Sequence, residues 1–334
     1  MLRIKLTPYR EELGKIYHRQ SKGHRMISLD GRYEFVIDDG SADSPSNDGE
    51  YDFWIVQGKG VRRPETVKVA PENVLFMATE PRSILIYPKS YLRQFAKRVR
   101  GFHLPWYIGF QEDENDVATY NLDYDQLKAM PTPDKPRLIS VISSNKSFTQ
   151  GHIDRQKFVK RLKAHFGDAL DVYGRGNNGF DDKWDVVAPY KYHIVIENSR
   201  EKDYWTEKLG DCYLAESFPF YYGPENVGEF FPEEAFCAID IKDPEGAIRI
   251  IEEQIKRDRY EEAKGVLKEC KDMMLDQWNI LEVCARECDK LDPTLPKKEV
   301  TIYPCKSSSV WKNFWRYTIG RKWYEIKGRW EVRD

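Results

Sequence analysis

The sequence of 334 residues predicts an α/β fold with two domains. Short apolar runs rich in β-branched residues, typical of buried strands, alternate with stretches whose apolar residues recur at helical spacing. The length suits about two domains, since a domain usually holds about 100–200 residues. The segment 131–136 contains three prolines, which can continue neither a helix nor a central strand. We therefore expect domains at 1–130 and 137–291, a linker at 131–136, and a tail at 292–334.

Composition and charge exclude several classes of protein. The formal net charge of −2 gives no overall field that would attract nucleic acid, so we expect no nucleic-acid partner. No apolar run approaches the roughly 18 residues of a membrane-spanning helix, and the first residues lack the apolar core of a secretory signal. The six cysteines form no CxxC pair and have no histidines at zinc spacing. These features predict a cytoplasmic protein with reduced thiols.

In the first domain we expect strands at 2–6, 33–37, 51–56 and 74–77. Glu80 follows the last of these, and Pro81 restricts its backbone to an extended conformation that presents the side chain at the strand end. From the residues alone, a solvent-exposed turn glutamate explains Glu80 better. The acidic pairs near residues 38 and 123 are typical of solvated turns, so we expect no metal site there.

In the second domain the polar residues gather behind a strand at 193–196, in the loop that precedes a helix at 206–217. Ligands of doubly wound sheets bind at the carboxyl ends of the strands, where this loop would lie. Lys208 near a helix start suits a phosphate, and the Glu207 carboxylate can accept hydrogen bonds from ribose hydroxyls. An ordinary helix capped by Thr206, with charged residues in its first turn, is an equally good interpretation.

The segment 197–236 resembles the donor-site signature of the family-ten glycosyltransferases, the α1,3/4-fucosyltransferases. That signature reads approximately FENS, then DYxTEK, a helix, YYG, and a later proline and phenylalanine. Trp205 departs from it, because the family prefers an aliphatic residue there. The matching positions are Glu197, Asn198, Ser199, Asp203, Tyr204, Thr206, Glu207, Lys208, Pro219, Tyr222, Gly223, Pro232 and Phe236.

The resemblance implies a GT-B-like fold, in which two Rossmann-like domains face each other across a cleft. It also implies inverting transfer of L-fucose from GDP-fucose to a hydroxyl of a glycan or glycolipid, in α1,3 or α1,4 linkage, as in lipopolysaccharide or capsule synthesis. No cofactor is required, and a divalent metal would at most stimulate the reaction. Two alternatives remain: another GDP-deoxyhexose donor on the same fold, and a catalytically inert glycan-binding relative.

The resemblance also implies roles for individual residues. Glu80 corresponds to the catalytic base, and Arg155 contacts the diphosphate. Phe110, Glu112 and Asp113 correspond loosely to an acceptor-facing segment. The full set of donor-site positions is Ser144, Asn145, Arg155, Tyr173, Gly174, Arg175, Gly176, Asn177, Glu197, Asn198, Tyr204, Thr206, Glu207 and Lys208.

The last segment, 310–334, interleaves aromatic and basic residues. This mixture suits an anionic membrane surface, with the rings at the headgroup level, and it predicts a peripheral contact with the inner membrane face. Nucleic acid is a second interpretation of the segment. The third is a strand pair or a helix that packs on the body of the protein.

Overall fold

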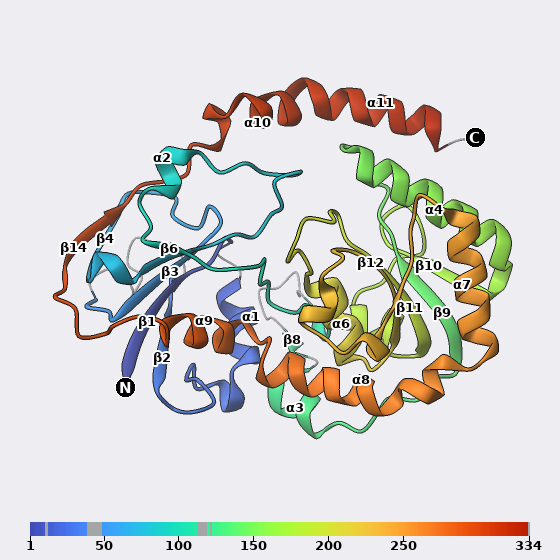
Figure 1. The fold of residues 1–334 in the computed structure, drawn as a ribbon, viewed down its shortest axis with the longest axis horizontal. Coiled ribbons are helices and arrows are strands. Elements are labelled where there is room, and N and C mark those ends of the chain that lie inside the picture. Colours follow the sequence, from blue (N-terminus) through green and yellow to red (C-terminus); the bar gives the residue numbers. More distant parts are fainter. Residues whose placement is uncertain (11–12, 39–48, 112–118, 121, 333–334) are drawn as a thin grey trace. The chain divides into compact units, whose positions relative to one another are not determined.

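The structure is a computed structural model that describes residues 1–10, 13–38, 49–111, 119–120 and 122–332. The chain forms two compact units that alternate along the sequence (Figure 1). Unit 1 comprises Met1–Pro105, Leu122–Lys128 and Leu275–Phe314, and unit 2 comprises Trp106–Asn121, Ala129–Met274 and Trp315–Asp334. The chain passes from one unit to the other after residues 105, 121, 128, 274 and 314, and the proposed linker at 131–136 lies within unit 2.

Unit 1 contains a parallel sheet of five strands among its described residues, in the order β2-β1-β3-β5-β6. The order corresponds to 2-1-3-4-5 along the chain, that of a doubly wound sheet. Strand β3 is buried along its whole length, which explains its continuous apolar sequence. The elements are β1 (Leu2–Thr7), α1 (Leu13–Gln20), β2 (Tyr33–Ile37), β3 (Phe53–Gln57), β4 (Glu65–Val69), β5 (Val74–Met77), α2 (Lys89–Leu92), β6 (Lys97–Arg98), α9 (Ile280–Cys288) and β14 (Lys298–Ile302).

Two parts of unit 1 come from distant stretches of sequence. Strand β14 pairs antiparallel with β4, a pairing between 298–302 and 65–69 that local patterns do not predict. Helix α9 packs near α1, with Ile280, Leu281 and Cys284 buried. The proposed domain boundaries assign these two elements to the donor domain and the tail, whereas their contacts lie in unit 1.

Unit 2 contains a five-stranded sheet of the same order, β10-β9-β11-β12-β13, in which every described pair is parallel. Its strands β7 and β8 form a separate antiparallel pair. Helix α4 packs on β10 and lies beside α7 (Figure 1). The elements are β7 (Phe110–Gln111), β8 (Thr119–Tyr120), β9 (Arg137–Ile142), α4 (Gln150–Phe166), β10 (Leu170–Tyr173), α5 (Lys183–Val187), β11 (Tyr190–Ile196), α6 (Glu207–Leu214), β12 (Phe218–Tyr222), β13 (Cys237–Ala238) and α7 (Pro244–Lys256). Helices α3 (Tyr124–Ala129) and α8 (Arg259–Asp276) each cross from one unit to the other along the chain.

The described part of the last segment, 310–332, is helical and does not form a strand pair. It contains α10 (Trp311–Trp315), a more widely wound turn at Arg316–Gly320, and α11 (Arg321–Glu331). Among the described residues, no helix has the length and apolar character to cross a bilayer. All six cysteines are free.

Candidate functional site in unit 2

Two polar loops of unit 2 meet where the sheet reverses its winding direction. Strands β9 and β11 are neighbours, while β10, which follows β9 in the chain, lies on the other side of β9. The loop 143–145 leaves the carboxyl end of β9, and Glu197 and Asn198 leave that of β11. This reversal point is where doubly wound sheets bind their ligands. The sheet order therefore brings the predicted donor residues of both loops to one edge.

A tight turn after β10 forms a second side of this edge. Gly174 has φ +115° and Gly176 has φ +89°, backbone conformations that residues with a side chain rarely adopt. A Cβ on Gly174 would lie 2.7 Å from the Ser143 carbonyl oxygen, and one on Gly176 would lie 2.8 Å from Asn145 Nδ2. Asn177 Nδ2 donates to the Ser143 carbonyl at 2.9 Å. Both glycines therefore allow the turn to pack directly on the loop after β9.

Arg155 lies on α4 and is 7% exposed. Its Nη1 donates to Asn198 Oδ1 at 3.2 Å and its Nη2 to Ser144 Oγ at 3.3 Å, so the guanidinium joins the loops after β9 and β11. Its Nε is buried and has no hydrogen-bond partner. Within the described part of the chain no carboxylate forms an ion pair with Arg155. Burial lowers the pKa of Arg155 to about 10, which reflects the cost of holding this cation without a counter-charge.

The surroundings of Arg155 are positive. His152 is one helical turn before it, and its Nδ1 pairs with the hydroxyl of Thr149, the N-cap of α4. Burial, together with the charges of Arg155, Lys146 and Lys208, lowers the pKa of His152 to about 3. His152 is therefore neutral at physiological pH and brings no additional charge. An anion at this edge of the sheet would relieve the uncompensated charge of Arg155.

Lys208 does not stand alone at the helix start. Its Nζ lies 3.3 Å from Glu197 Oε2, 3.3 Å from Glu207 Oε1 and 2.9 Å from Thr206 Oγ1. Thr206 caps α6, and its hydroxyl donates to the buried Glu197 carboxylate. The capped helix and the charged cluster therefore coexist, and three partners already occupy the ammonium group of Lys208.

The charges of this cluster are strongly coupled. Burial would raise the pKa of Glu207, but the positive charges of Lys208 and Lys183 outweigh it and lower the value to about 2. Burial would lower the pKa of Lys208, yet Glu197 and Glu207 outweigh that effect and raise it. Burial raises the pKa of Glu197, although Lys208 and the donors of Thr206 oppose the rise. Glu207 and Lys208 thus remain ionised.

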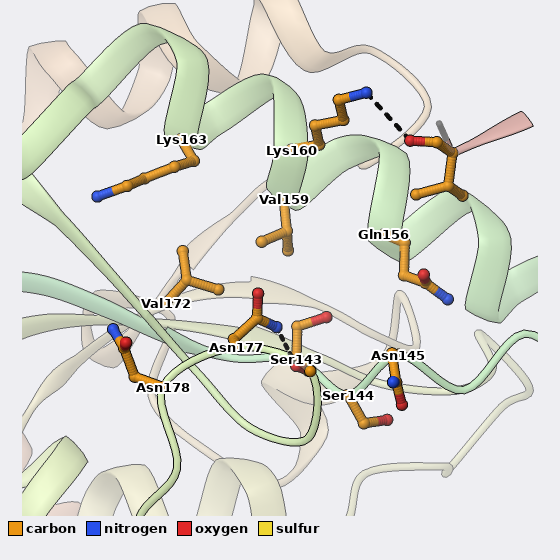
Figure 2. A pocket seen from close by; sticks show the side chains of 12 residues that line it. Ser143, Ser144, Asn145, Gln156, Val159, Lys160, Lys163, Val172, Asn177 and Asn178 are labelled. Atoms are coloured by element: carbon orange, nitrogen blue, oxygen red, sulfur yellow. Dashed lines mark hydrogen bonds between the residues drawn. The ribbon is translucent and has the colours of Figure 1, made fainter. Parts of the chain in front are cut away.

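A cavity of about 450 Å³ lies between α4, β10, the loop 143–145 and the turn 176–178 (Figure 2). Figure 2 shows the Lys160 and Lys163 side chains projecting from α4 above it, with Val159 and Val172 facing each other across it. Ser144, Asn145, Gly176 and Asn177, all predicted donor residues, belong to its lining. Val332, directly after α11, also lines this cavity, which no pattern in the sequence predicted.

The remaining predicted positions vary in their placement. The Tyr173 hydroxyl bonds to Tyr190 Oη at 2.7 Å and accepts from Arg137 on the face of the sheet, so only its backbone carbonyl meets the loop after β9. Arg175 is exposed, and its carbonyl accepts from Asn145 N at 2.9 Å. Tyr204 is buried. A negative charge on its hydroxyl would raise the pKa of Lys208, so Tyr204 lies near the cluster of Glu197, Glu207 and Lys208.

The predicted acceptor segment is described only in part. Glu112 and Asp113 lie outside the described residues, and the backbone of Phe110 begins the short strand β7. The residues just before it belong to unit 2: Gly109 N donates to Asp182 Oδ1 at 2.8 Å. Two aspartates that the sequence reasoning did not select, Asp182 and Asp211, therefore fix the start of this segment, because Asp211 Oδ1 accepts from Tyr107 N at 2.9 Å.

In unit 1, Glu80 is half-buried and lies three residues beyond the end of β5, as expected from the strand and Pro81. Neighbouring contacts define its surroundings: Thr79 Oγ1 lies 3.3 Å from Tyr87 Oη, and a Cβ on Gly58 would lie 2.5 Å from Thr79 Oγ1. Burial raises the pKa of Tyr87 to about 12, and the charge of Glu80 contributes to the rise. Glu80 thus lies close to the Tyr87 hydroxyl at a carboxyl end of the unit-1 sheet.

Among the described residues, no group of three or more histidine, cysteine, aspartate or glutamate side chains lies close enough together to hold a metal ion. Asp123 instead caps α3, since its Oδ1 accepts from Gln126 N at 2.8 Å, and it pairs with His24. The Asp123 carboxylate therefore has structural partners within unit 1.

Residues 132–261 match the family model for the C-terminal part of glycosyltransferase family 10 (fucosyltransferase). The mouse alpha-(1,3)-fucosyltransferase 4 is 29% identical over 150 residues, which cover 40% of this chain and 34% of that protein. The rat 4-galactosyl-N-acetylglucosaminide 3-alpha-L-fucosyltransferase 9 is 26% identical over 174 residues, covering 47% of each chain. The matched part thus spans about a third to a half of these relatives.

One solved structure, an α1,3-fucosyltransferase crystallised with GDP, aligns with a TM-score of 0.50 at 16% identity. The alignment covers 87% of this chain and 91% of that one. At this identity the likeness concerns the fold. It confirms the predicted α/β, GT-B-like class with two Rossmann-like units.

Proposed function

We propose that the chain is a family-ten glycosyltransferase, because residues 132–261 match the C-terminal part of that family. In this proposal it transfers L-fucose from GDP-fucose to a hydroxyl of a glycan, in α1,3 or α1,4 linkage and with inversion at the anomeric carbon. The edge of unit 2 built by Arg155, Asn198 and the loop after β9 is the proposed donor site. Its relatives named above are fucosyltransferases, and the α1,3-fucosyltransferase of similar fold was crystallised with GDP.

The observation that carries the proposal is the buried, uncompensated guanidinium of Arg155. An isolated buried charge costs several kcal/mol, so such a group persists where a ligand supplies the opposite charge. A diphosphate suits it in both charge and geometry, because guanidinium binds phosphate oxygens with two parallel N–H groups. During transfer, negative charge develops on the departing GDP, and Arg155 would stabilise it without a bound metal.

Glu207 and Lys208 have proposed roles that follow from their pairing. Two carboxylates and one ammonium leave the cluster of Glu197, Glu207 and Lys208 with a net charge of −1 when all are ionised, so it is a poor primary site for a diphosphate. We propose that Lys208 orients Glu207 toward the ribose hydroxyls and contacts phosphate only by exchanging one of its present partners. Asn198, Tyr204 and the turn 174–177 would complete the lining of the donor site.

Glu80 is the proposed general base. It would take the proton from the acceptor hydroxyl as that oxygen attacks the anomeric carbon, and the bond to GDP breaks on the opposite face of the sugar. The proposal rests on the family motif and on the position of Glu80 at a strand end of unit 1, half-buried beside Tyr87.

A panel of nucleotides and nucleotide sugars, followed by thermal unfolding, tests the donor assignment. GDP-fucose at about 100 times its dissociation constant should stabilise the protein by about 2.7 kcal/mol. GDP should stabilise it as well, whereas UDP-sugars should not. If another GDP-deoxyhexose stabilised the protein more than GDP-fucose does, that sugar would be the donor sugar. Stabilisation by UDP-sugars alone would overturn the assignment of GDP as the nucleotide.

We further propose that α11 contacts an anionic lipid surface. Ile319, Trp323, Ile326 and Trp330 recur at helical spacing and are 50–75% exposed, and Lys322 and Arg329 flank them on the exposed side. A stripe of this composition fits the boundary between headgroups and acyl chains, and each basic residue near an anionic surface adds about 1 kcal/mol.

Sedimentation with vesicles tests the lipid contact. The protein should pellet with vesicles that contain phosphatidylserine and not with neutral phosphatidylcholine vesicles, and Trp323→Ser with Trp330→Ser should abolish the pelleting. Equal pelleting of this double variant and the wild type would refute the contact. Binding of an oligonucleotide without any binding of anionic vesicles would assign the stripe to nucleic acid instead.

A further inference from the structure

The side of α11 that faces the protein packs against the loop of the donor site. Gly328 is buried, and a Cβ at this position would lie 2.6 Å from Ser147 Cβ and 3.6 Å from Ile153 Cγ1. Real Cβ atoms essentially never approach other atoms within 3.0 Å. Only glycine therefore allows α11 to approach the loop 143–147 this closely.

Polar contacts hold the same side of α11 to α4. Lys327 Nζ donates to Gln150 Oε1 at 2.7 Å, and Gln150 Nε2 donates to Asp154 Oδ1 at 2.7 Å. Further along, Lys157 Nζ pairs with Glu331 Oε2 at 2.5 Å. These contacts run along the first turns of α4, the part of the helix that carries Arg155.

The end of α11 reaches the cavity itself. Lys160 Nζ donates to the Val332 carbonyl at 3.1 Å, a bond drawn in Figure 2, and Val332 belongs to the residues that line the cavity. The last turn of the chain thus closes one side of a cavity whose other walls are the loop 143–145 and the turn 176–178.

The loop 143–147 transmits these contacts to the guanidinium. Gln156 Nε2 donates to the Lys146 carbonyl at 2.6 Å, which holds the loop on α4. Ser144 Oγ accepts from Arg155 Nη2 at 3.3 Å, three residues before Ser147. The loop therefore lies between Gly328 of α11 and Arg155, and a shift imposed on one side of it moves the other.

We propose that Gly328 and the inner side of α11 are positioning elements of the donor site: they set the loop 143–147, and through it Arg155, for the diphosphate. The inference rests on the donor site proposed above. Helix α11 then serves two purposes, with its exposed stripe toward lipid and its inner side against the nucleotide site, and it is not a separable anchor.

Gly328→Ala tests the positioning role, with Gly265→Ala as its matched control. Both residues lie inside helices, so both substitutions gain the same helix propensity, but no atom lies within 4 Å of a Cβ at Gly265. We expect Gly328→Ala to raise the dissociation constant of GDP and the KM for GDP-fucose about tenfold, since sub-ångström displacement of binding groups has large effects. The kcat, the KM for the acceptor and the melting temperature should change little. Gly265→Ala should match the wild type in all of these.

A compensating substitution sharpens the test. Ser147→Gly removes the Cβ that an alanine at 328 would meet, so Gly328→Ala combined with Ser147→Gly should recover most of the GDP affinity. The GDP affinity of Ser147→Gly alone is the reference against which the double variant is compared. Unchanged GDP affinity in Gly328→Ala, or loss that Ser147→Gly does not recover, would overturn the positioning role while the donor site stands. A wild-type protein that binds no GDP would overturn the donor site, and the positioning role with it.

Discussion

Replacing Arg155 by methionine should separate stability from donor binding. The side chain is 7% exposed, and its pKa of about 10 lies well below the usual value of an arginine, which corresponds to about 3 kcal/mol of unfavourable burial of the charge. Methionine removes this cost and fills much of the same space. The lost hydrogen bonds to Asn198 and Ser144 contribute about 1 kcal/mol each in the other direction. The free energy of unfolding should therefore stay within about 2 kcal/mol of the wild type, and on this balance it should rise.

The same substitution should strongly weaken GDP binding. A hydrogen bond to a charged group contributes about 1.5–3 kcal/mol, which equals roughly a 10- to 150-fold change in the dissociation constant. Urea unfolding gives the stability, and titration calorimetry gives the affinity for GDP. Arg161→Met is the matched control on the same helix, because Arg161 is only partly buried and pairs with Glu245 at 2.7 Å. This control should keep the GDP affinity of the wild type.

One result would show that Arg155 does not bind the diphosphate. If Arg155→Met binds GDP as tightly as the wild type and unfolds several kcal/mol more easily, the guanidinium is a structural link between the loops after β9 and β11. Its missing counter-charge would then not indicate an anionic ligand.

Three more substitutions test other parts of the proposal. Glu80→Gln should lower turnover by about 10²–10⁴ and leave the GDP affinity unchanged, and normal turnover in Glu80→Gln with a loss in Glu112→Gln would move the base to Glu112. Lys208→Ala should weaken GDP binding, measured by calorimetry. It should also lower the unfolding free energy by about 3–5 kcal/mol, because the buried Glu197 loses its partner. An unchanged melting temperature would refute the pairing of Lys208 with Glu197. Burial lowers the pKa of His193 to about 3, so acid protonates the unfolded chain first and stability is lost as the pH falls below about 6.5. Between pH 7 and pH 5 this loss should amount to about 2 kcal/mol in urea unfolding, and equal pH dependence in His193→Asn would contradict it.

The sequence predicted the strands of both sheets from local pattern. Strands β2 and β5 have the bounds that the apolar runs indicated. All four residues of β5 are buried, whereas in β2 the exposed Glu34 lies between buried Tyr33 and Phe35, the alternation of a half-buried strand. The position of the polar loops followed, since loops that leave the carboxyl ends of parallel strands share one edge of a sheet. Arg155, Ser144 and Asn198 came together for this reason.

Contacts between distant segments could not be predicted in this way. The pairing of β4 with β14 joins residues more than two hundred positions apart, and neither strand differs from an ordinary edge strand in sequence. The partners of Lys208 depend on where the end of β11 meets the start of α6. The sequence therefore did not predict that the Lys208 ammonium pairs with both Glu197 and Glu207. Nothing in the tail indicated that Gly328 would pack on the donor-site loop.

The most direct test of the proposed activity is a single transfer reaction. The wild-type protein is incubated with GDP-fucose and a mixture of glycan acceptors, and released GDP and fucosylated product are measured together, with the anomeric configuration of the new bond read by NMR. The proposed function predicts equal amounts of GDP and fucosylated glycan, with the configuration inverted relative to the donor. Binding of GDP-fucose without any release of GDP across a broad set of acceptors would contradict it and favour a glycan-binding relative without catalysis.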